Sequence, residues 1–173
     1  MTQSGRSQKR EILNRVAAIL LLILLPTVAI SEEVADKVLV DKSDEKLYLL
    51  SGTTVLAEYK VSFGANPRGH KQIEGDERTP EGEYVLDHKK EDSAFYRAIH
   101  ISYPNDEDKK AAAARGKDPG GAIMIHGQKN WLGWLSPITQ RFNWTDGCIA
   151  VTNGEMDEIW EMVSVNTPIE IRE

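Results

Sequence analysis

Apolar and polar residues alternate along much of the chain, which is the pattern of strands that bury one face. The alternation over residues 37–41 and 46–50, on either side of a polar turn at 43–45, predicts a β-hairpin. Residues 55–63 predict a third strand. Further strands are predicted from short apolar runs, at residues 84–87, 98–102, 122–125, 148–151 and 167–171. A polar, glycine-rich stretch over residues 64–82 has no periodicity, and its length favours a binding loop.

Helical spacing of apolar residues is found in two segments. Residues 106–115 begin with acidic side chains, contain an alanine run and end before Gly116. Asn153 is predicted to cap a second helix, whose apolar positions are Met156, Ile159, Trp160 and Val163. No repeat or linker divides the chain, so the sequence predicts a single mainly β domain with two short helices.

Residues 1–31 are predicted to be a signal peptide or an N-terminal anchor. Four basic residues precede an apolar run over 16–30, which as a helix would span roughly 22 Å and so fall short of a ~30 Å hydrocarbon core. Small residues at Ala29 and Ser31 fit a cleavage site. Both alternatives predict an exported protein of the periplasm or cell envelope, with residues 16–30 as the segment suited to membrane anchoring.

Charge and composition exclude several classes of function. The 173 residues carry 21 Lys and Arg against 27 Asp and Glu, a formal net charge of −6, and basic clusters occur only in the first fifteen residues. This balance argues against a nucleic-acid partner. The four histidines and scattered acids do not have the spacing of a metal site, so the sequence predicts no metal and no cofactor. His88 is interpreted as a solvated strand end, and His100 as a core or rim residue.

The single cysteine, Cys148, is the leading candidate for chemistry, because an unpaired thiol in an exported domain is exposed to oxidation and needs a reason to be kept. A thiol attacks carbonyls as the thiolate, which a neighbouring histidine generates. His126 follows an apolar strand and is the best candidate base. The backbone N–H groups of Gly147 and Cys148 are candidate oxyanion donors. Spacing alone leaves a catalytic pair and a structural role equally open.

Several motifs together resemble the YkuD-type L,D-transpeptidase catalytic domain. The sequence Ile-Met-Ile-His126-Gly127, an aromatic loop and then Thr145-Asp146-Gly147-Cys148 is similar to the family's pattern of a histidine, a loop and Ser/Thr-His-Gly-Cys. The hairpin at 37–50 and the element Thr-Pro-Glu-Gly-Glu-Tyr at 79–84 resemble further family motifs. The resemblance covers residues 37–171 and implies a β-sandwich-like catalytic domain.

The resemblance implies an exported cysteine acyltransferase that acts on peptidoglycan stem peptides and cross-links or remodels the cell wall. Cys148 would be the nucleophile and His126 the general base and proton donor, with the ring oriented by a carbonyl near Gly127. The thiolate would attack at meso-diaminopimelate, expel D-Ala and form a thioester. The acceptor would be an amine of a neighbouring stem or a lipoprotein lysine.

Three departures from the family pattern leave alternatives open. The loop after His126 is slightly long, Asp146 replaces the family's second histidine, and Ala150 occupies a position that is commonly Arg or Asn. A carboxylate at Asp146 is expected to raise the pKa of the thiol unless it turns away, and the roles of Thr145 and Asp146 are open. The alternatives are an L,D-carboxypeptidase or amidase that hydrolyses bonds at diaminopimelate, and a non-catalytic wall-binding module.

Two further groups of residues are candidates for a substrate groove. Three tryptophans of the loop, Trp131, Trp134 and Trp144, either pack the loop against the domain or form a lid over the thioester. Arg68 and His70 either bind a substrate carboxylate or belong to a solvated surface loop.

Overall fold

The computed structural model describes residues 33–173, and the predicted signal or anchor segment lies outside the described residues. Over residues 33–173, none of the helices is long and apolar enough to cross a membrane. The strands are β1 (Lys37–Asp41), β2 (Lys46–Ser51), β3 (Thr54–Lys60), β4 (Gly82–Ser93), β5 (Tyr96–Ile101), β6 (Met124–His126), β7 (Ile149–Ala150) and β8 (Thr167–Arg172). The helices are α2 (Asp106–Ala113), the 3-10 turn η1 (Gly133–Leu135), α3 (Ser136–Thr139) and α4 (Asn153–Met162).

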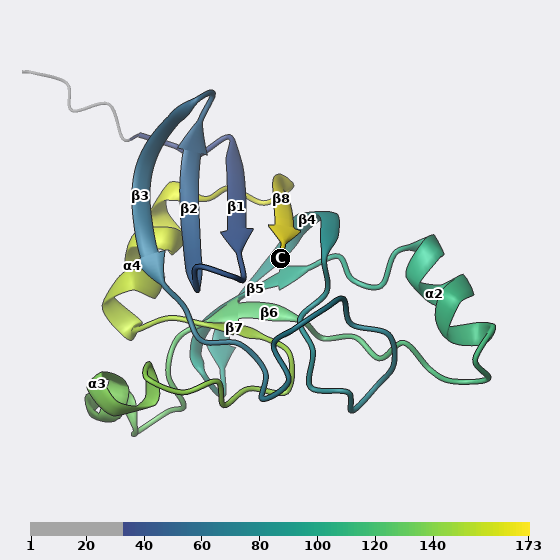
Figure 1. Ribbon diagram of the computed structural model, residues 1–173. Coiled ribbons are helices and arrows are strands. Elements are labelled where there is room, and N and C mark those ends of the chain that lie inside the picture. The colour runs from purple at the N-terminus through teal and green to yellow at the C-terminus, as the bar shows by residue number, and fades with distance from the viewer. Residues whose placement is uncertain (1–32) are drawn as a thin grey trace, which may run out of the picture. The chain divides into compact units, whose positions relative to one another are not determined.

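All eight strands join one sheet in the order β3-β2-β1-β8-β4-β5-β6-β7 (Figure 1). The pairs β1–β8 and β6–β7 are parallel, and the other pairs are antiparallel. The sheet curls until its two edges meet, because Ser62, just after β3, pairs with Ala150 in β7 through N–H···O bonds of 2.9 and 2.8 Å. The predicted mainly β fold class is confirmed, and its sandwich-like packing comes from one curled sheet.

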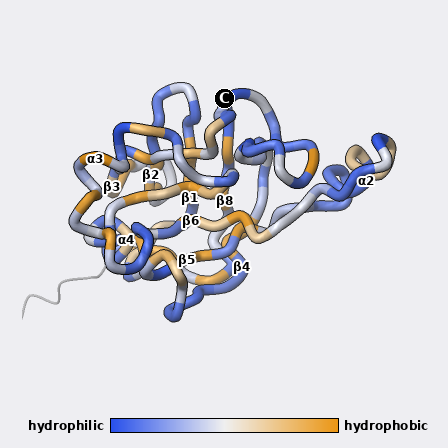
Figure 2. The backbone as a smooth tube through the Cα atoms, turned by 90° about the horizontal axis from the view of Figure 1, so that it is seen from below, coloured by the Kyte–Doolittle hydropathy of each residue, from blue (hydrophilic) through white to orange (hydrophobic). Residues whose placement is uncertain are grey.

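The core lies inside the curl, where the alternation read from the sequence buries one face of each strand. Val38, Val40, Leu47 and Leu49 are fully buried, as is the central Phe63. The strands accordingly contain the most hydrophobic stretches of the tube in Figure 2. The helix α4 packs on β5 and adds two more buried side chains to this core, Met156 and Ile159.

The helices differ from the sequence prediction in number and in one cap. The two expected helices are present as α2 and α4, but the loop after His126 contains a third, the single turn α3, which begins with Ser136 and Pro137 as proline's fixed φ favours. Asn153 is not the cap of α4. Thr152 caps it in a capping box with Glu155, because the threonine hydroxyl can accept from the third residue's N–H.

The β4–β5 hairpin is longer than predicted. β4 extends on both sides of the predicted residues 84–87, and β5 begins before the predicted 98–102 and ends at Ile101, because backbone pairing continues through a polar segment that carries no apolar alternation. The register also shifts between Leu86 and His88, where Asp87 is an extra residue in β4. The stretch 64–82 has no helix or strand before Gly82, as expected.

Candidate active site

The catalytic candidates lie on neighbouring parallel strands. His126 is the last residue of β6, and Cys148 directly precedes β7. In the parallel register Ile125 pairs with Ile149 and His126 with Ala150. Cys148 therefore lies beside Met124, and side chains alternate faces along each strand, so the thiol and the imidazole occupy the same face of the sheet.

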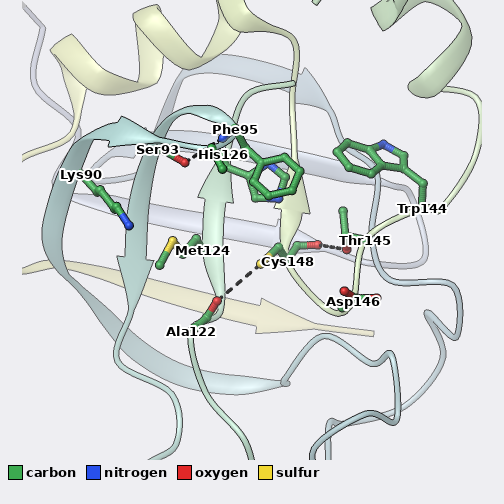
Figure 3. A pocket seen from close by; sticks show the side chains of 11 residues that line it. Lys90, Ser93, Phe95, Ala122, Met124, His126, Trp144, Thr145, Asp146 and Cys148 are labelled. Atoms are coloured by element: carbon green, nitrogen blue, oxygen red, sulfur yellow. Dashed lines mark hydrogen bonds between the residues drawn. The ribbon is translucent and has the colours of Figure 1, made fainter. Parts of the chain in front are cut away.

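Both side chains open into one cavity of about 300 Å³ (Figure 3). The β4–β5 hairpin forms one wall, and the turn before Cys148 forms another. The other lining residues are Lys90, Ser93, Ala94, Phe95, Ala122, Met124, Trp144, Thr145 and Asp146.

The imidazole of His126 is held in one tautomer. Its Nδ1 lies 2.6 Å from the carbonyl oxygen of Gly127, and a carbonyl only accepts, so Nδ1 carries the hydrogen and Nε2 keeps a free lone pair. The ring is buried against Phe95 and Trp144, at centroid distances of 4.6 and 5.8 Å. Burial lowers the pKa of His126. The hydrogen bond to the Gly127 carbonyl raises it, but by less. Burial therefore favours the neutral form of the ring, whose Nε2 can accept a proton.

Cys148 is held as a thiol. Its Sγ–H donates to the carbonyl oxygen of Ala122 at 3.6 Å, and within residues 33–173 the sulfur makes no hydrogen bond to the His126 ring (Figure 3). Burial raises the pKa of Cys148, and the Asp146 carboxylate raises it further, as expected from its charge. The N–H of Met124 and the ammonium group of Lys71 lower the pKa of the thiol.

The turn before Cys148 is fixed by Thr145. The Thr145 hydroxyl donates to the carbonyl oxygen of Cys148 at 2.8 Å and accepts the Gly147 N–H at 3.2 Å. Gly147 has a φ of +119°, and a Cβ there would lie 2.5 Å from the carbonyl oxygen of Arg78. The Gly147 N–H thus already has a partner, which it would exchange for a substrate oxygen in order to serve as an oxyanion donor.

The segment after His126 is anchored by two polar residues that the sequence did not single out for this task. The side-chain oxygen of Asn153 accepts the Gln128 N–H at 2.8 Å, and it would lie 2.8 Å from a Cβ on Gly127. The buried Gln128 amide donates to the Val151 carbonyl and accepts from the Thr139 hydroxyl. These bonds tie α3 to the start of α4 and fix the backbone whose carbonyl orients His126.

The structure brings only some of the predicted groove residues to the cavity. Trp144 lines it, whereas Trp131 and Trp134 are 95% and 75% exposed and do not. Arg68 lines a different hollow, beside the C-terminal Glu173.

His70 lies in a polar network away from the thiol. Its Nε2 is 3.1 Å from Asp108, and its Nδ1 accepts the Glu81 N–H at 3.0 Å. Sequence reasoning missed Lys90, Phe95 and Met124 as cavity residues. Their positions depend on the β4–β5–β6 register, for which the sequence has no local signal.

A cysteine and a neutral histidine that share one cavity are the groups that a thiol-dependent acyl-transfer domain requires. The chain belongs to the YkuD family of L,D-transpeptidase catalytic domains, whose family model matches residues 35–171.

Three relatives with larger chains extend this finding. YafK of Escherichia coli (strain K12), named as an L,D-transpeptidase, is 34% identical over 112 residues, 64% of this chain and 38% of YafK. A variant of the helical cell shape determining protein Pgp2 from Campylobacter jejuni has 29% identity and a TM-score of 0.61, covering 83% of this chain and 48% of Pgp2. Bd1075 of Bdellovibrio bacteriovorus has 25% identity and a TM-score of 0.52, covering 85% of this chain and 50% of its own. The chain thus spans about half or less of these relatives.

Proposed function

We propose that this protein is an exported cysteine acyltransferase that performs L,D-transpeptidation on peptidoglycan stem peptides. The family supports a peptidoglycan-related activity. The observation that carries the proposal is the position of the Cys148 thiol and the neutral His126 ring on one face of the sheet and in one cavity. Its predicted localisation is the periplasm or cell envelope, reached through the segment 1–31.

The first half of the reaction forms a thioester. The Cys148 thiol leaves the Ala122 carbonyl and gives its proton to Nε2 of His126. The thiolate then attacks the carbonyl carbon at the L-centre of meso-diaminopimelate. The bond to the terminal D-Ala breaks, and His126 returns the proton to the departing amine.

The second half transfers the acyl group. An amine of a neighbouring stem, or a lipoprotein lysine, attacks the thioester and gives a proton to His126, while the Cys148 sulfur leaves. Two charged groups at the cavity suit these partners. The exposed ammonium of Lys90 attracts the terminal carboxylate of the donor, and the Asp146 carboxylate attracts a cationic acceptor amine.

The proposal is tested with the full chain and purified tetrapeptide muropeptides. Wild type is expected to release D-Ala and to form cross-linked dimers, and mass spectrometry is expected to detect a thioester on Cys148. Cys148→Ala and His126→Ala are expected to lose all three, and Cys148→Ser, which keeps the side-chain shape, is the matched control for the sulfur. Equal product formation by wild type and Cys148→Ala would overturn the proposal.

Hydrolysis is a second candidate, favoured by the Asp146 carboxylate at the cavity, which can hold a water molecule near the thioester as well as an amine. A carboxypeptidase or amidase would use the same first half-reaction. Incubation in ¹⁸O-labelled water separates the two outcomes. Label in a shortened stem, with no dimer, identifies a hydrolase, whereas unlabelled dimers identify a transpeptidase.

A further inference from the structure

Three side chains with metal-binding atoms meet at the register shift between Leu86 and His88, in the middle of β4 and near the end of β5. Nδ1 of His88 and Nδ1 of His100 lie 2.9 and 2.7 Å from the same carboxylate oxygen of Asp87. The two imidazole rings stack with centroids 4.6 Å apart. The ligand atoms of the three residues all lie within 4.8 Å of one another.

The β-bulge in β4 creates this cluster. In a regular strand, Asp87 and His88 would point to opposite faces. Here Leu86 pairs with Ile101 and His88 pairs with His100, so Asp87 is the extra residue. A bulge places two residues of one strand opposite one residue of its partner and re-aims their side chains. Asp87 and His88 consequently both meet His100.

The donor set suits a divalent transition metal. Imidazole nitrogen and carboxylate oxygen are the ligands of Zn²⁺ at about 2.0–2.2 Å, so ligand atoms around a tetrahedral ion lie roughly 3.3 Å apart. Small rotations of the side chains would widen the observed distances of 2.9 and 2.7 Å, between the two Nδ1 atoms and the Asp87 carboxylate oxygen, to this value. Each neutral imidazole would shift its hydrogen from Nδ1 to Nε2, so binding requires no net loss of a proton from the ring.

The cluster is also accessible. The side chains of His88, Asp87 and His100 are 56%, 37% and 19% exposed. An ion can therefore reach the cluster from solvent.

We propose that Asp87, His88 and His100 bind one divalent transition-metal ion of the Zn²⁺ type, with a water or a carboxylate in the fourth position. The site is separate from the thiol but lies on the same face of the sheet. His100 pairs with Met124, which lies beside Cys148, so the site is two strands, about 10 Å, from the strand of the nucleophile. A metal there is a structural or anion-binding element next to the cavity and takes no part in forming the thiolate.

The test is zinc binding to the full chain, measured by isothermal titration calorimetry. Wild type is expected to bind one equivalent, and affinity is expected to fall at least about tenfold in His100→Ala, His88→Ala and Asp87→Asn. His70→Gln removes an imidazole outside the cluster and is the matched control, with affinity unchanged. Cys148→Ala is also expected to bind normally.

A spectroscopic measurement separates this site from a metal on the nucleophile. Co²⁺ at the cluster is expected to show a visible spectrum of nitrogen and oxygen ligands, without thiolate charge transfer, in both wild type and Cys148→Ala. Loss of binding in Cys148→Ala, equal affinity in wild type and His100→Ala, or no binding at micromolar free zinc would overturn the proposal. Circular dichroism of each variant excludes unfolding as the cause of a lost affinity. His88→Ala is the substitution that disturbs the fold least, because it alters the most exposed of the three ligands.

Discussion

The hydroxyl of Thr145 donates a hydrogen bond to the backbone carbonyl of Cys148, 2.8 Å away, and so closes the turn that carries the Cys148 thiol. The same oxygen accepts the Gly147 N–H. Thr145→Val keeps the shape but removes both bonds, each of which contributes about 1 kcal/mol. We expect kcat/KM on tetrapeptide muropeptides to fall about tenfold, because the sulfur and its neighbouring amides lose their fixed positions.

Thr145→Ser is the matched control for this prediction, since serine keeps the hydroxyl. We expect its kcat/KM to stay within about threefold of wild type, because its hydroxyl can form both bonds. Equal losses in Thr145→Val and Thr145→Ser would show that the methyl packing, not the hydrogen bonds, is what matters at this position.

Asp146 supplies a pH-dependence that can be measured without substrate. Burial is the largest cause that raises the pKa of Cys148, and the Asp146 carboxylate raises it further. Asp146→Asn removes that charge, so the thiol pKa should fall and more thiolate should be present at pH 7. We expect the pH profile of Cys148 alkylation by iodoacetamide to move to lower pH, with a faster rate at neutral pH. The difference should shrink at high salt.

The matched control is Asp106→Asn, which removes another exposed carboxylate from the start of α2 and should leave the alkylation profile unchanged. A profile for Asp146→Asn that coincides with wild type, or that moves to higher pH, would mean that the carboxylate does not act on the sulfur.

The local parts of the fold were predictable because they rest on short-range patterns. Alternation predicted the first hairpin, and the apolar runs beside His126 and Cys148 predicted that one strand ends at His126 and another begins at Cys148. The helix α3 was not predictable, because its segment has no apolar periodicity and is held by the distant Gln128 and Asn153.

The rest of the site depends on pairing between strands that are far apart in sequence. Phe95 meets His126 only because β5 pairs with β6, and Asp87 meets His100 only because β4 contains a bulge. Neither the register nor the bulge has a signature in the residues themselves. The sequence therefore singled out Cys148 and His126, which share the cavity, but it could not show that Trp131 lies outside this cavity with its side chain in solvent.

Asp76 makes the glycine-rich loop sensitive to acid. Its carboxylate accepts the N–H groups of Gln72, Ile73 and Arg78 and the ammonium of Lys71. Burial alone would raise the pKa of Asp76, but these donors together lower it. A lowered pKa stabilises the folded state above the unfolded value of about 3.9, and this contribution is lost as pH falls through the folded pKa.

We expect Asp76→Asn to lower the free energy of unfolding by about 2–3 kcal/mol at pH 7, because it leaves the buried Lys71 ammonium without its counter-ion. The dependence of stability on pH between about 5 and 3 should also become shallower. Urea unfolding at a series of pH values measures both effects. Glu77→Gln, at an exposed position in the same loop, should stay within about 0.5 kcal/mol of wild type, and a similar loss in both variants would contradict the assignment.

Gly147 leaves the turn before Cys148 no room for a side chain. Its φ of +119° is strained for any residue with a side chain, and an added Cβ would lie 2.5 Å from the Arg78 carbonyl oxygen, which belongs to backbone and cannot rotate away. We expect Gly147→Ala to lower the free energy of unfolding by at least about 2 kcal/mol and to abolish D-Ala release, because the turn must move and takes Cys148 with it.

Gly154→Ala is the matched control, since its Cβ would meet nothing within 4 Å at the start of α4. That variant should be equal to wild type or up to about 1 kcal/mol more stable, with full activity. Denaturant unfolding and the muropeptide assay measure both variants, and an active, stable Gly147→Ala would show that the turn tolerates a different backbone path.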